Sequence, residues 1–369
     1  MSYDSSLPPR TRPSGQPQRP PKSRQPKPKP RKKRRLAKFL FGFFLMIILG
    51  LGAYAVYLYT ELDGALKESS SGATSQTVPS AERAQVKPIA IVLLGMDYRP
   101  KIGGMNTDVM MVAAFNPHSK TATVVSIPRD SELGMKGYVE QKVNQFYAGF
   151  HRTARTKEGL KDAAADAYAR DKTREMLGKY FGIDIDYTAV LNFQGFVDVI
   201  DKLGGVNVTV DKNMKYVDNA DGTNIDLKAG EQTLNGEDAL GFVRYRKSNR
   251  GTAPSSDFER NERQSQVLGA IVDKMKSVGG AIKLGGVIDV AGKNLITDIP
   301  QAQIMNILKT YYDINREDTR FLPLTGDWKS PYVYLDAKSV EAAKQALAEE
   351  LSSEGRPKTS DSASPSVTK

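Results

Sequence analysis

The longest unbroken run of apolar positions lies near the start of the chain. Residues 39–60 carry no charge, and Lys38 and Glu61 flank them. A helix of this length rises about 1.5 Å per residue and spans roughly 33 Å, enough to cross a hydrocarbon core of about 30 Å. We therefore predict one N-terminal transmembrane helix at 39–60. A cleavable signal peptide is the alternative, because Ala53-Tyr54-Ala55 imitates its cleavage site.

From residue 87 onward the apolar positions alternate between the period of a strand and that of a helix. Strand patterns cover 87–94, 109–115, 121–127, 206–210 and 242–245, and helical patterns cover 158–181, 193–203, 234–240, 259–278 and 339–351. Because no low-complexity linker divides this stretch, the sequence predicts a single mixed α/β domain at 88–351. Residues 61–87 are predicted to form a polar linker before it, and residues 352–369 a disordered tail after it.

Charge is distributed unevenly between the start of the chain and the rest. Residues 1–35 contain twelve Lys and Arg residues, one acid and nine prolines, whereas the remaining 334 residues contain 41 basic and 41 acidic side chains. The net charge of +11 therefore lies in this first segment. We predict that residues 1–38 form a disordered cytoplasmic tail, since basic flanks of a membrane span stay inside. The domain at 88–351 would then be extracellular, on a single-pass protein of the cell membrane.

The composition limits the chemistry that this domain can perform. The chain contains no cysteine and two histidines, His118 and His151. Disulfide scaffolds, thiolate metal sites and a cysteine nucleophile are thereby excluded. Catalysis must depend on carboxylates, amines, guanidinium groups or hydroxyls.

Two aspartates lie at neighbouring ends of predicted strands. Asp97 follows the first strand and Asp108 precedes the second. Ligands of α/β sheets bind at strand ends, and two carboxylates together with substrate phosphates suit Mg²⁺. The alternative is that both residues simply end strands as turn formers.

A third strand end carries an arginine beside an aspartate. Pro128 stops the strand 121–127 and directs Arg129 and Asp130 out of the sheet at the same edge. The planar fork of arginine matches phosphate oxygens, which favours Arg129 as an anion ligand. A surface ion pair between the two residues is the alternative.

More cations follow in the second half of the domain. On the strand predicted from Phe242, the period of two places Arg244 and Arg246 on one face, where they would repel unless an anion lay between them. A solvated face is the alternative.

The predicted helix at 259–278 begins with further candidates. Ser256 and Glu259 have the spacing of a capping box. Arg260, Arg263 and Gln264 would then share one face of the first turns, where cations are disfavoured without a bound anion. A solvated surface of arginines and glutamates is the alternative. Lys142 is a weaker candidate, because an isolated lysine is usually solvated.

Taken together, these cations and carboxylates favour metal-assisted phosphoryl chemistry over acyl transfer or glycoside hydrolysis. Their surroundings also resemble ordered motifs of the LytR-CpsA-Psr family, over about residues 88–278. The motifs are Leu93-Leu94-Gly95-Met96-Asp97-Tyr98-Arg99, Asn106-Thr107-Asp108-Val109-Met110, Ser126-Ile127-Pro128-Arg129-Asp130, Lys142-Val143-Asn144, Phe193-Gln194-Gly195-Phe196-Val197-Asp198, Leu203-Gly204-Gly205-Val206, Leu234-Asn235-Gly236-Glu237, Val243-Arg244-Tyr245-Arg246 and Arg260-Asn261-Glu262-Arg263-Gln264.

The resemblance implies an α/β/α domain with a central mixed sheet. Its implied activity is to take an anionic glycopolymer, of teichoic acid or capsule type, from a polyprenyl-pyrophosphate carrier and to attach it to peptidoglycan through a phosphodiester. It also implies that Asp97 and Asp108 hold Mg²⁺, that Asp130 orients Arg129, and that Asp257 assists the arginines. The implied pyrophosphate ligands are Arg129, Lys142, Arg244, Arg246, Arg260 and Gln264, to which the first turns of the helix add Arg263. The predicted helices 158–181 and 193–203 are candidate walls of an apolar slot for the lipid.

Two other functions stay open on the sequence. One is a polyprenyl-pyrophosphate hydrolase, and the other is an envelope sensor or transcription attenuator without catalysis. The basic tail supports the second, since it could bind nucleic acid or anionic lipid. Apart from Tyr3, however, the tail has no aromatic residue that could stack on bases. We therefore interpret the tail as a topology signal and expect no nucleic acid partner. Membrane lipid is expected as a partner of the protein.

Overall fold

A computed structural model describes residues 77–96, 105–219 and 222–358 of the chain. The predicted transmembrane helix, the basic tail and Asp97 lie outside these residues. Within the described ranges, no helix is both long and apolar enough to cross a membrane.

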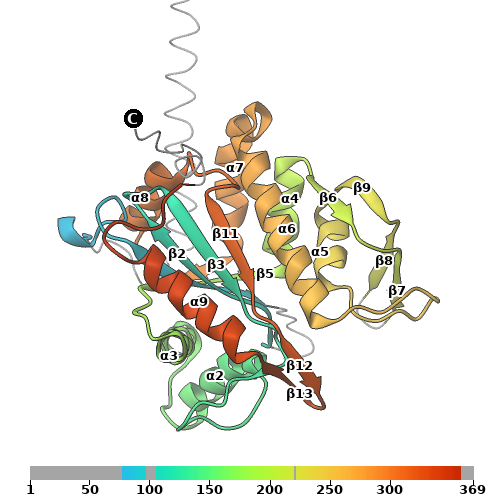
Figure 1. The fold of residues 1–369 in the computed structure, drawn as a ribbon, viewed down its shortest axis with the longest axis horizontal. Coiled ribbons are helices and arrows are strands. Elements are labelled where there is room, and N and C mark those ends of the chain that lie inside the picture. The colour runs from blue at the N-terminus through green and yellow to red at the C-terminus, as the bar shows by residue number, and fades with distance from the viewer. Residues whose placement is uncertain (1–76, 97–104, 220–221, 359–369) are drawn as a thin grey trace, which may run out of the picture. The chain divides into compact units, whose positions relative to one another are not determined.

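A six-stranded mixed sheet forms the centre of the domain (Figure 1). Its spatial order is β10 (Leu295–Thr297), β5 (Tyr187–Asn192), β1 (Ile89–Met96), β2 (Thr107–Asn116), β3 (Thr121–Ser126) and β11 (Thr319–Pro323). The β1/β5 and β3/β11 pairs are parallel, whereas the other three pairs are antiparallel. The predicted mixed sheet is therefore confirmed, and β1, β2 and β3 match the first three predicted strands.

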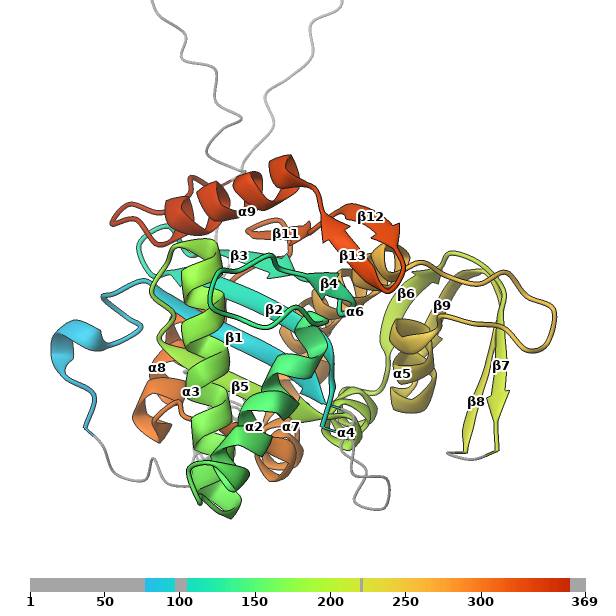
Figure 2. The same cartoon turned by 90° about the horizontal axis from the view of Figure 1, so that it is seen from below.

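Helices cover both faces of this sheet (Figures 1 and 2). They are α2 (Phe146–Thr156), α3 (Asp162–Phe181), α4 (Phe193–Leu203), α5 (Gly236–Arg244), α6 (Asp257–Lys276), α7 (Val278–Asn294), α8 (Gln301–Tyr311) and α9 (Ala337–Glu350), with the short 3₁₀ helices η1 (Ser80–Glu82) and η2 (Val143–Gln145). The period-two pattern of β1 divides the layers. Val92 and Leu94 pack with Met176 of α3, whereas Ile89 and Ile91 pack with Tyr311 of α8 on the other face.

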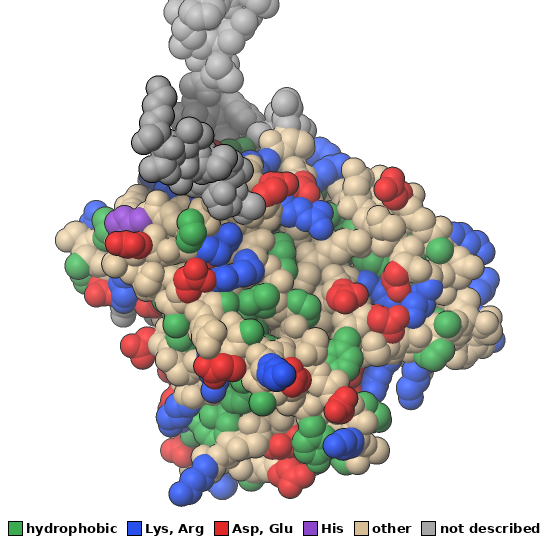
Figure 3. All heavy atoms as spheres, viewed as in Figure 1, with side chains coloured by type: hydrophobic (Ala, Val, Ile, Leu, Met, Phe, Trp, Pro, Cys, Tyr) green, Lys and Arg blue, Asp and Glu red, His purple; other side chains and the backbone are tan. Residues whose placement is uncertain are grey.

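Three small sheets surround the central one. β12 (Gly326–Lys329) and β13 (Tyr332–Leu335) form a hairpin that adds β4 (Ser131–Glu132) as a third strand. Two two-stranded sheets lie beside α5 and α6 (Figure 2). One consists of β6 (Val206–Val210) and β9 (Gly230–Leu234), and the other of β7 (Met214–Asp218) and β8 (Thr223–Leu227). On the face shown in Figure 3, acidic and basic side chains are interspersed.

The strand predicted at 242–245 is wrong, because residues 242–244 belong to α5 and Tyr245 is its C-cap. The Asn235 side chain accepts a hydrogen bond from the Asp238 backbone N–H (2.8 Å) and caps this helix. Its buried positions, Ala239, Leu240, Phe242 and Val243, then follow the helical spacing i, i+1, i+3 and i+4. Arg244 and Arg246 therefore do not share the face of a strand.

Contacts with the domain also come from residues on either side of 88–351. The buried Ala84 donates its backbone N–H to the Gln303 side chain (3.2 Å). At the other end, Asn116 Nδ2 donates to the carbonyl oxygen of Ser352 (2.7 Å). These polar contacts hold both flanks against the sheet.

Candidate active site

The candidate residues gather at the edge of the sheet where β1 ends and β2 begins. In the β1/β2 ladder Gly95 faces Val109 and Met96 faces Thr107, so the register shift leaves Asp108 as an extra residue. Such a bulge re-aims a side chain and is frequent beside active sites. Gly95 is required there, because a Cβ atom on it would lie 2.8 Å from the Cβ atom of Val109.

Asp130 holds three cations around one buried carboxylate. Only 2% of this residue is exposed. Its oxygens lie 3.1 Å from Lys142 Nζ, 3.0 Å from Arg246 Nη2 and 3.9 Å from Arg129 Nε. Since a buried carboxylate needs compensating charge, these contacts fix Asp130 as the residue that positions all three cations. Lys142, weak on the sequence alone, is thus part of the cluster.

Arg129 connects this group to Asp108. Its Nη1 donates to Asp108 Oδ1 at 2.5 Å. Burial alone would lower the pKa of Arg129, but the charge of Asp108 and this hydrogen bond outweigh it and raise the pKa above its ordinary value. Arg129 is therefore a fixed positive charge beside the bulge.

Arg260 adds a fourth cation from the first turn of α6. It is 3% exposed, and its Nη1 donates to Asp257 Oδ1 at 2.6 Å. Burial and then the neighbouring charge of Arg129 lower the pKa of Arg260. The Nε atoms of Arg129 and Arg260 are both buried without a hydrogen-bond partner. Two such donors, in a group of four cations and three carboxylates, suit a bound oxyanion.

The predicted capping box at the start of α6 is confirmed. The Ser256 backbone N–H donates to Glu259 Oε2 (2.6 Å), and the Glu259 backbone N–H donates to Ser256 Oγ (3.2 Å). This cap begins the helix at Asp257, so that Asp257 and Arg260 face each other across one turn.

Arg263 does not join the cluster. Its guanidinium makes two parallel hydrogen bonds to Asp211, of 2.7 and 2.8 Å, and also binds Ser255 Oγ and the Tyr245 carbonyl oxygen. Side chains three positions apart on a helix differ in direction by about 60°. Arg263 therefore points away from Arg260 and the cluster, toward the end of β6. Arg263 thus fastens α6 to the small sheet, whereas Gln264 faces an apolar cavity.

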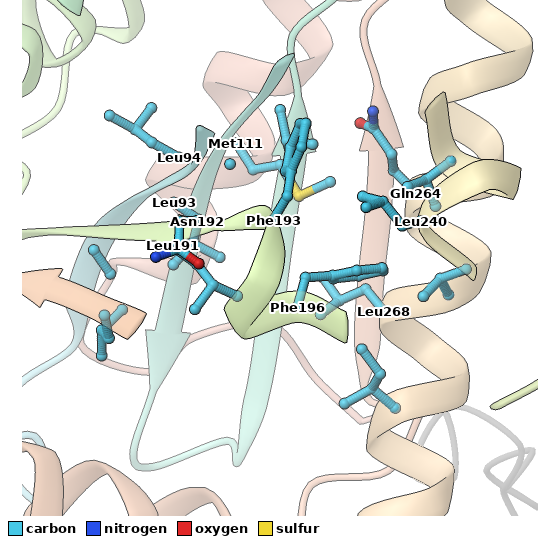
Figure 4. Close-up of a pocket in the computed structure, with 17 residues that line it drawn as sticks. Leu93, Leu94, Met111, Leu191, Asn192, Phe193, Phe196, Leu240, Gln264 and Leu268 are labelled. Carbon is cyan, nitrogen blue, oxygen red and sulfur yellow. The ribbon is translucent and has the colours of Figure 1, made fainter. Parts of the chain in front are cut away.

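This cavity, of about 280 Å³, lies between the sheet and α4, α5 and α6 (Figure 4). Its lining is almost wholly apolar and consists of Leu93, Leu94, Gly95, Val109, Met111, Ala189, Leu191, Asn192, Phe193, Phe196, Leu240, Val243, Gln264, Val267, Leu268, Ile271 and Leu295. Phe193 and Phe196 extend into it from α4 (Figure 4). The guanidinium of Arg244 lies 4.8 Å from the centre of the Phe193 ring, so a cation adjoins the cavity wall.

One of the two helices expected to form this slot lies elsewhere. The segment 193–203 forms α4 and does line the cavity. The segment 158–181 does not: α3 begins at Asp162 and packs on the opposite face of the sheet, where Met176 and Leu177 contact Val92. The sequence shows that both helices have apolar faces, but not which face of the sheet each one covers.

A second pocket, also of about 280 Å³, adjoins the charged cluster at Arg129 and Arg246. Arg129, Arg244, Arg246 and Lys247 line it together with Tyr216, Thr223, Ile225 and Tyr245. The β7/β8 pair supplies the wall opposite the cations. This pocket is therefore strongly cationic on one side.

The described residues fit a magnesium ion through Asp108. Its carboxylate is a hard oxygen donor beside a cationic cluster, and Mg²⁺ commonly uses one or two carboxylates together with water and substrate phosphates. No group of three His, Asp or Glu side chains in the described ranges could hold a metal alone.

Comparison with known proteins places this arrangement in a family. The model of the LytR_cpsA_psr family matches residues 54–353. Among curated relatives, the polyisoprenyl-teichoic acid–peptidoglycan teichoic acid transferase TagV of Bacillus subtilis (strain 168) is 29% identical over 321 residues, which cover 85% of this chain and 77% of that protein. TagU of Bacillus cereus (strain AH820), of the same description, is 30% identical over 84% of this chain and 93% of its own.

Solved structures agree with this placement. The crystal structure of B. subtilis TagV superposes with a TM-score of 0.55 at 29% identity and covers 74% of this chain and 99% of that one. A structure described as TagT bound to LIIa-WTA superposes with a TM-score of 0.55 at 26% identity, over 76% and 96% of the two chains. With its sheet, its arginine cluster and its apolar cavity, the chain belongs to the LytR-CpsA-Psr family.

Proposed function

We propose that this protein transfers a glycopolymer from a polyprenyl-diphosphate carrier to a hydroxyl of peptidoglycan. The observation that carries the proposal is the continuity between the charged cluster and the apolar cavity. Along α6, Arg260 belongs to the cluster, whereas Gln264, Leu268 and Ile271, spaced by one turn or nearly so, line the cavity. One helix face thus changes from cationic to apolar in the order in which a prenyl diphosphate changes from head to tail.

The same change occurs on two other elements. On β2, Asp108 contacts Arg129, and the next residue, Val109, lines the cavity. On α5, Val243 lines the cavity and Arg244 adjoins it. The charged cluster and the cavity therefore adjoin along β2 and along the two successive helices α5 and α6. The curated relatives, whose descriptions name a polyisoprenyl carrier and peptidoglycan, support the same assignment.

The transfer would need positioning and charge neutralisation rather than a nucleophilic side chain. The acceptor hydroxyl oxygen attacks the polymer-side phosphorus, and the bond from that phosphorus to the bridging oxygen breaks. Prenyl monophosphate leaves with the bridging oxygen and its electron pair and takes up the proton that the hydroxyl loses. Arg129, Arg246 and Arg260 would stabilise the charge on the phosphoryl oxygens, and Asp130 and Asp257 would position these arginines.

Asp108, together with Asp97 eleven positions before it in the sequence, would hold a magnesium ion, which would neutralise part of the diphosphate charge. We further propose that residues 39–60 anchor the domain outside the cell membrane. A tether of this kind keeps the site within reach of a carrier that stays in the bilayer. The type of polymer, teichoic acid or capsule, is left to the assay.

The test is a transfer assay with the full chain in lipid nanodiscs, a prenyl-diphosphate-linked polymer, peptidoglycan fragments and Mg²⁺. Arg246→Ala should lower transfer about 100-fold, in the range measured for loss of one oxyanion donor. Lys215→Ala is the matched control, because the Lys215 side chain lies at the surface and pairs with Asp226 on β8. Release of prenyl phosphate without linked product would identify a hydrolase instead, and an unaffected Arg246→Ala protein would contradict the proposed role of the cluster.

A further inference from the structure

An aromatic hairpin adjoins the charged cluster on the side away from the apolar cavity. β4 starts directly after Asp130, and β13 pairs with it in parallel, with Val333 opposite Ser131. The Val333 backbone N–H donates to the carbonyl oxygen of Asp130 at 2.9 Å. β13 lies beside β4 (Figure 2), and the hairpin is thus fixed by its backbone to Asp130, the residue that positions three cations.

Trp328 lies on the face of this hairpin that turns toward the cluster. In the β12/β13 ladder it faces the buried Val333, whereas Tyr332 and Tyr334 belong to the opposite face. Lys142 Nζ lies 5.4 Å from the centre of the Trp328 ring and 3.1 Å from Asp130 Oδ1. One lysine side chain therefore connects the indole to the cluster.

The indole contributes little to the core. Trp328 is 49% exposed and belongs to none of the buried clusters among the described residues. A large aromatic face left in water beside a reaction site is typical of a binding surface. The fold therefore does not explain why the ring lies there.

The two neighbouring environments already suit the other parts of the reactants. The apolar cavity suits the prenyl tail, and the pocket lined by Arg129, Arg246 and Lys247 suits an anionic polymer. The remaining reactant is a glycan, whose sugar rings present apolar C–H faces. Such faces stack on an indole, and the hydroxyls at the ring edge can reach a neighbouring ammonium group.

We propose that Trp328 is the platform on which a sugar ring of the acceptor glycan stacks, with Lys142 beside it. This assignment rests on the proposed function and adds the acceptor subsite to it. The acceptor then reaches the diphosphate from the β12/β13 side, and the polymer chain extends out of the site on the β7/β8 side. Asp130 lies between the two, because it binds Lys142 on one side and Arg246 on the other.

Intrinsic fluorescence tests sugar binding directly, since Trp328 is the only tryptophan in the sequence. The full chain is titrated with a neutral probe, the β-1,4-linked tetramer of N-acetylglucosamine. We expect a saturable change in emission intensity with a shift to shorter wavelength as the ring loses water. An unchanged spectrum up to acceptor concentrations that saturate transfer would overturn the proposal. A response to polyglycerol phosphate but not to the tetramer would overturn it too, in favour of the donor polymer.

Kinetics of variants provide a second readout. Trp328→Ala should raise the KM for the acceptor about tenfold, a loss of about 1.4 kcal/mol, and leave the KM for the donor unchanged. Trp328→Phe should recover most of the loss. Tyr334→Ala is the matched control, because it removes an aromatic side chain of similar exposure from the other face of the same hairpin.

The outcomes separate this proposal from the proposed function. An equal rise in both KM values, or the same rise in Tyr334→Ala, would show a general effect of the hairpin and overturn the subsite. If wild-type protein yields no linked product, the proposed function fails, while the fluorescence titration still decides whether Trp328 binds sugar.

Discussion

Two arginines on one helix show how differently a buried guanidinium can be used. Arg260 and Arg263 are three residues apart on α6, and each is 3% exposed. Arg263 is almost fully paired, with two hydrogen bonds to Asp211 and others to Ser255 and Tyr245. Arg260 has Asp257 as its partner, lies near the charges of Arg129 and Arg246, and keeps a buried Nε without an acceptor.

The difference separates a structural cation from one that awaits a ligand. A paired guanidinium stabilises the fold, whereas buried donors without acceptors cost free energy until an anion supplies them. The cost is tolerated where the anion is the substrate. Substitutions at the two positions should therefore affect different quantities.

The largest expected effect is on activity at Arg260. Arg260→Lys retains the charge beside Asp257 but loses the planar guanidinium fork. The rate of transfer should therefore fall about 100-fold, as for loss of an oxyanion donor. Its thermal unfolding should change little. Steady-state kinetics and calorimetry on the same preparation measure both quantities, and near-normal transfer would show that Arg260 does not contact the diphosphate.

The next largest effect is on stability at Arg263. Arg263→Ala removes both hydrogen bonds of Asp211 and leaves it only the more distant Lys212. The free energy of unfolding should fall by about 2–3 kcal/mol, less than for a fully buried pair because Asp211 keeps contact with water. Chemical denaturation measures this change. The folded fraction should transfer within about twofold of wild type, and a 100-fold loss there would place Arg263 in the site after all.

A smaller effect is expected in the apolar cavity. Leu268→Phe fills part of the space and should displace about two methylene groups of a bound prenyl chain, which is worth roughly 1.6 kcal/mol. The KM for a long-chain donor should rise about 15-fold, while a donor with a short prenyl chain should be unaffected. Equal effects on both donors would indicate that the tail binds elsewhere.

The smallest effect concerns acid stability at Asp211. Burial opposes its ionisation, but the hydrogen bond and charge of Arg263 prevail and lower the pKa of Asp211. A lowered pKa in the folded state adds stability above the unfolded value of about 4, and this stability is lost as the pH falls through the folded value. Asp211→Asn should therefore flatten the dependence of stability on pH below about pH 4. Parallel curves for both proteins would contradict this linkage.

The sequence predicted the regular elements better than their positions in space. Phe193–Leu203 and Val206–Val210 were identified to the residue, because a helix with a clear apolar face ends at Gly204 and a strict alternation follows. The strand prediction for Phe242–Tyr245 is wrong, because so short an apolar run fits the period of a helix as well as that of a strand. The hydrogen bond from the Asp238 backbone N–H to the Asn235 side chain caps the segment as a helix.

The sequence named most residues of the charged cluster, but it predicted their geometry only in part. The spacing of Arg260, Arg263 and Gln264 suggested one shared face, yet the Asp211 carboxylate, 52 positions before Arg263, turns that arginine away. Lys142 enters the cluster only through its ion pair with Asp130. Trp328 comes close to the cluster only because β13 pairs with β4, which lies about two hundred residues earlier in the sequence. Such contacts depend on tertiary structure and leave no local pattern.

The most direct test of the central claim is a crystal structure of the full chain with a prenyl diphosphate and Mg²⁺. We predict that phosphate oxygens lie within hydrogen-bonding distance of Arg129 Nε and Arg260 Nε, with the prenyl chain between β2 and α6. A diphosphate bound away from both arginines, or a prenyl chain outside the cavity that Leu268 lines, would contradict it.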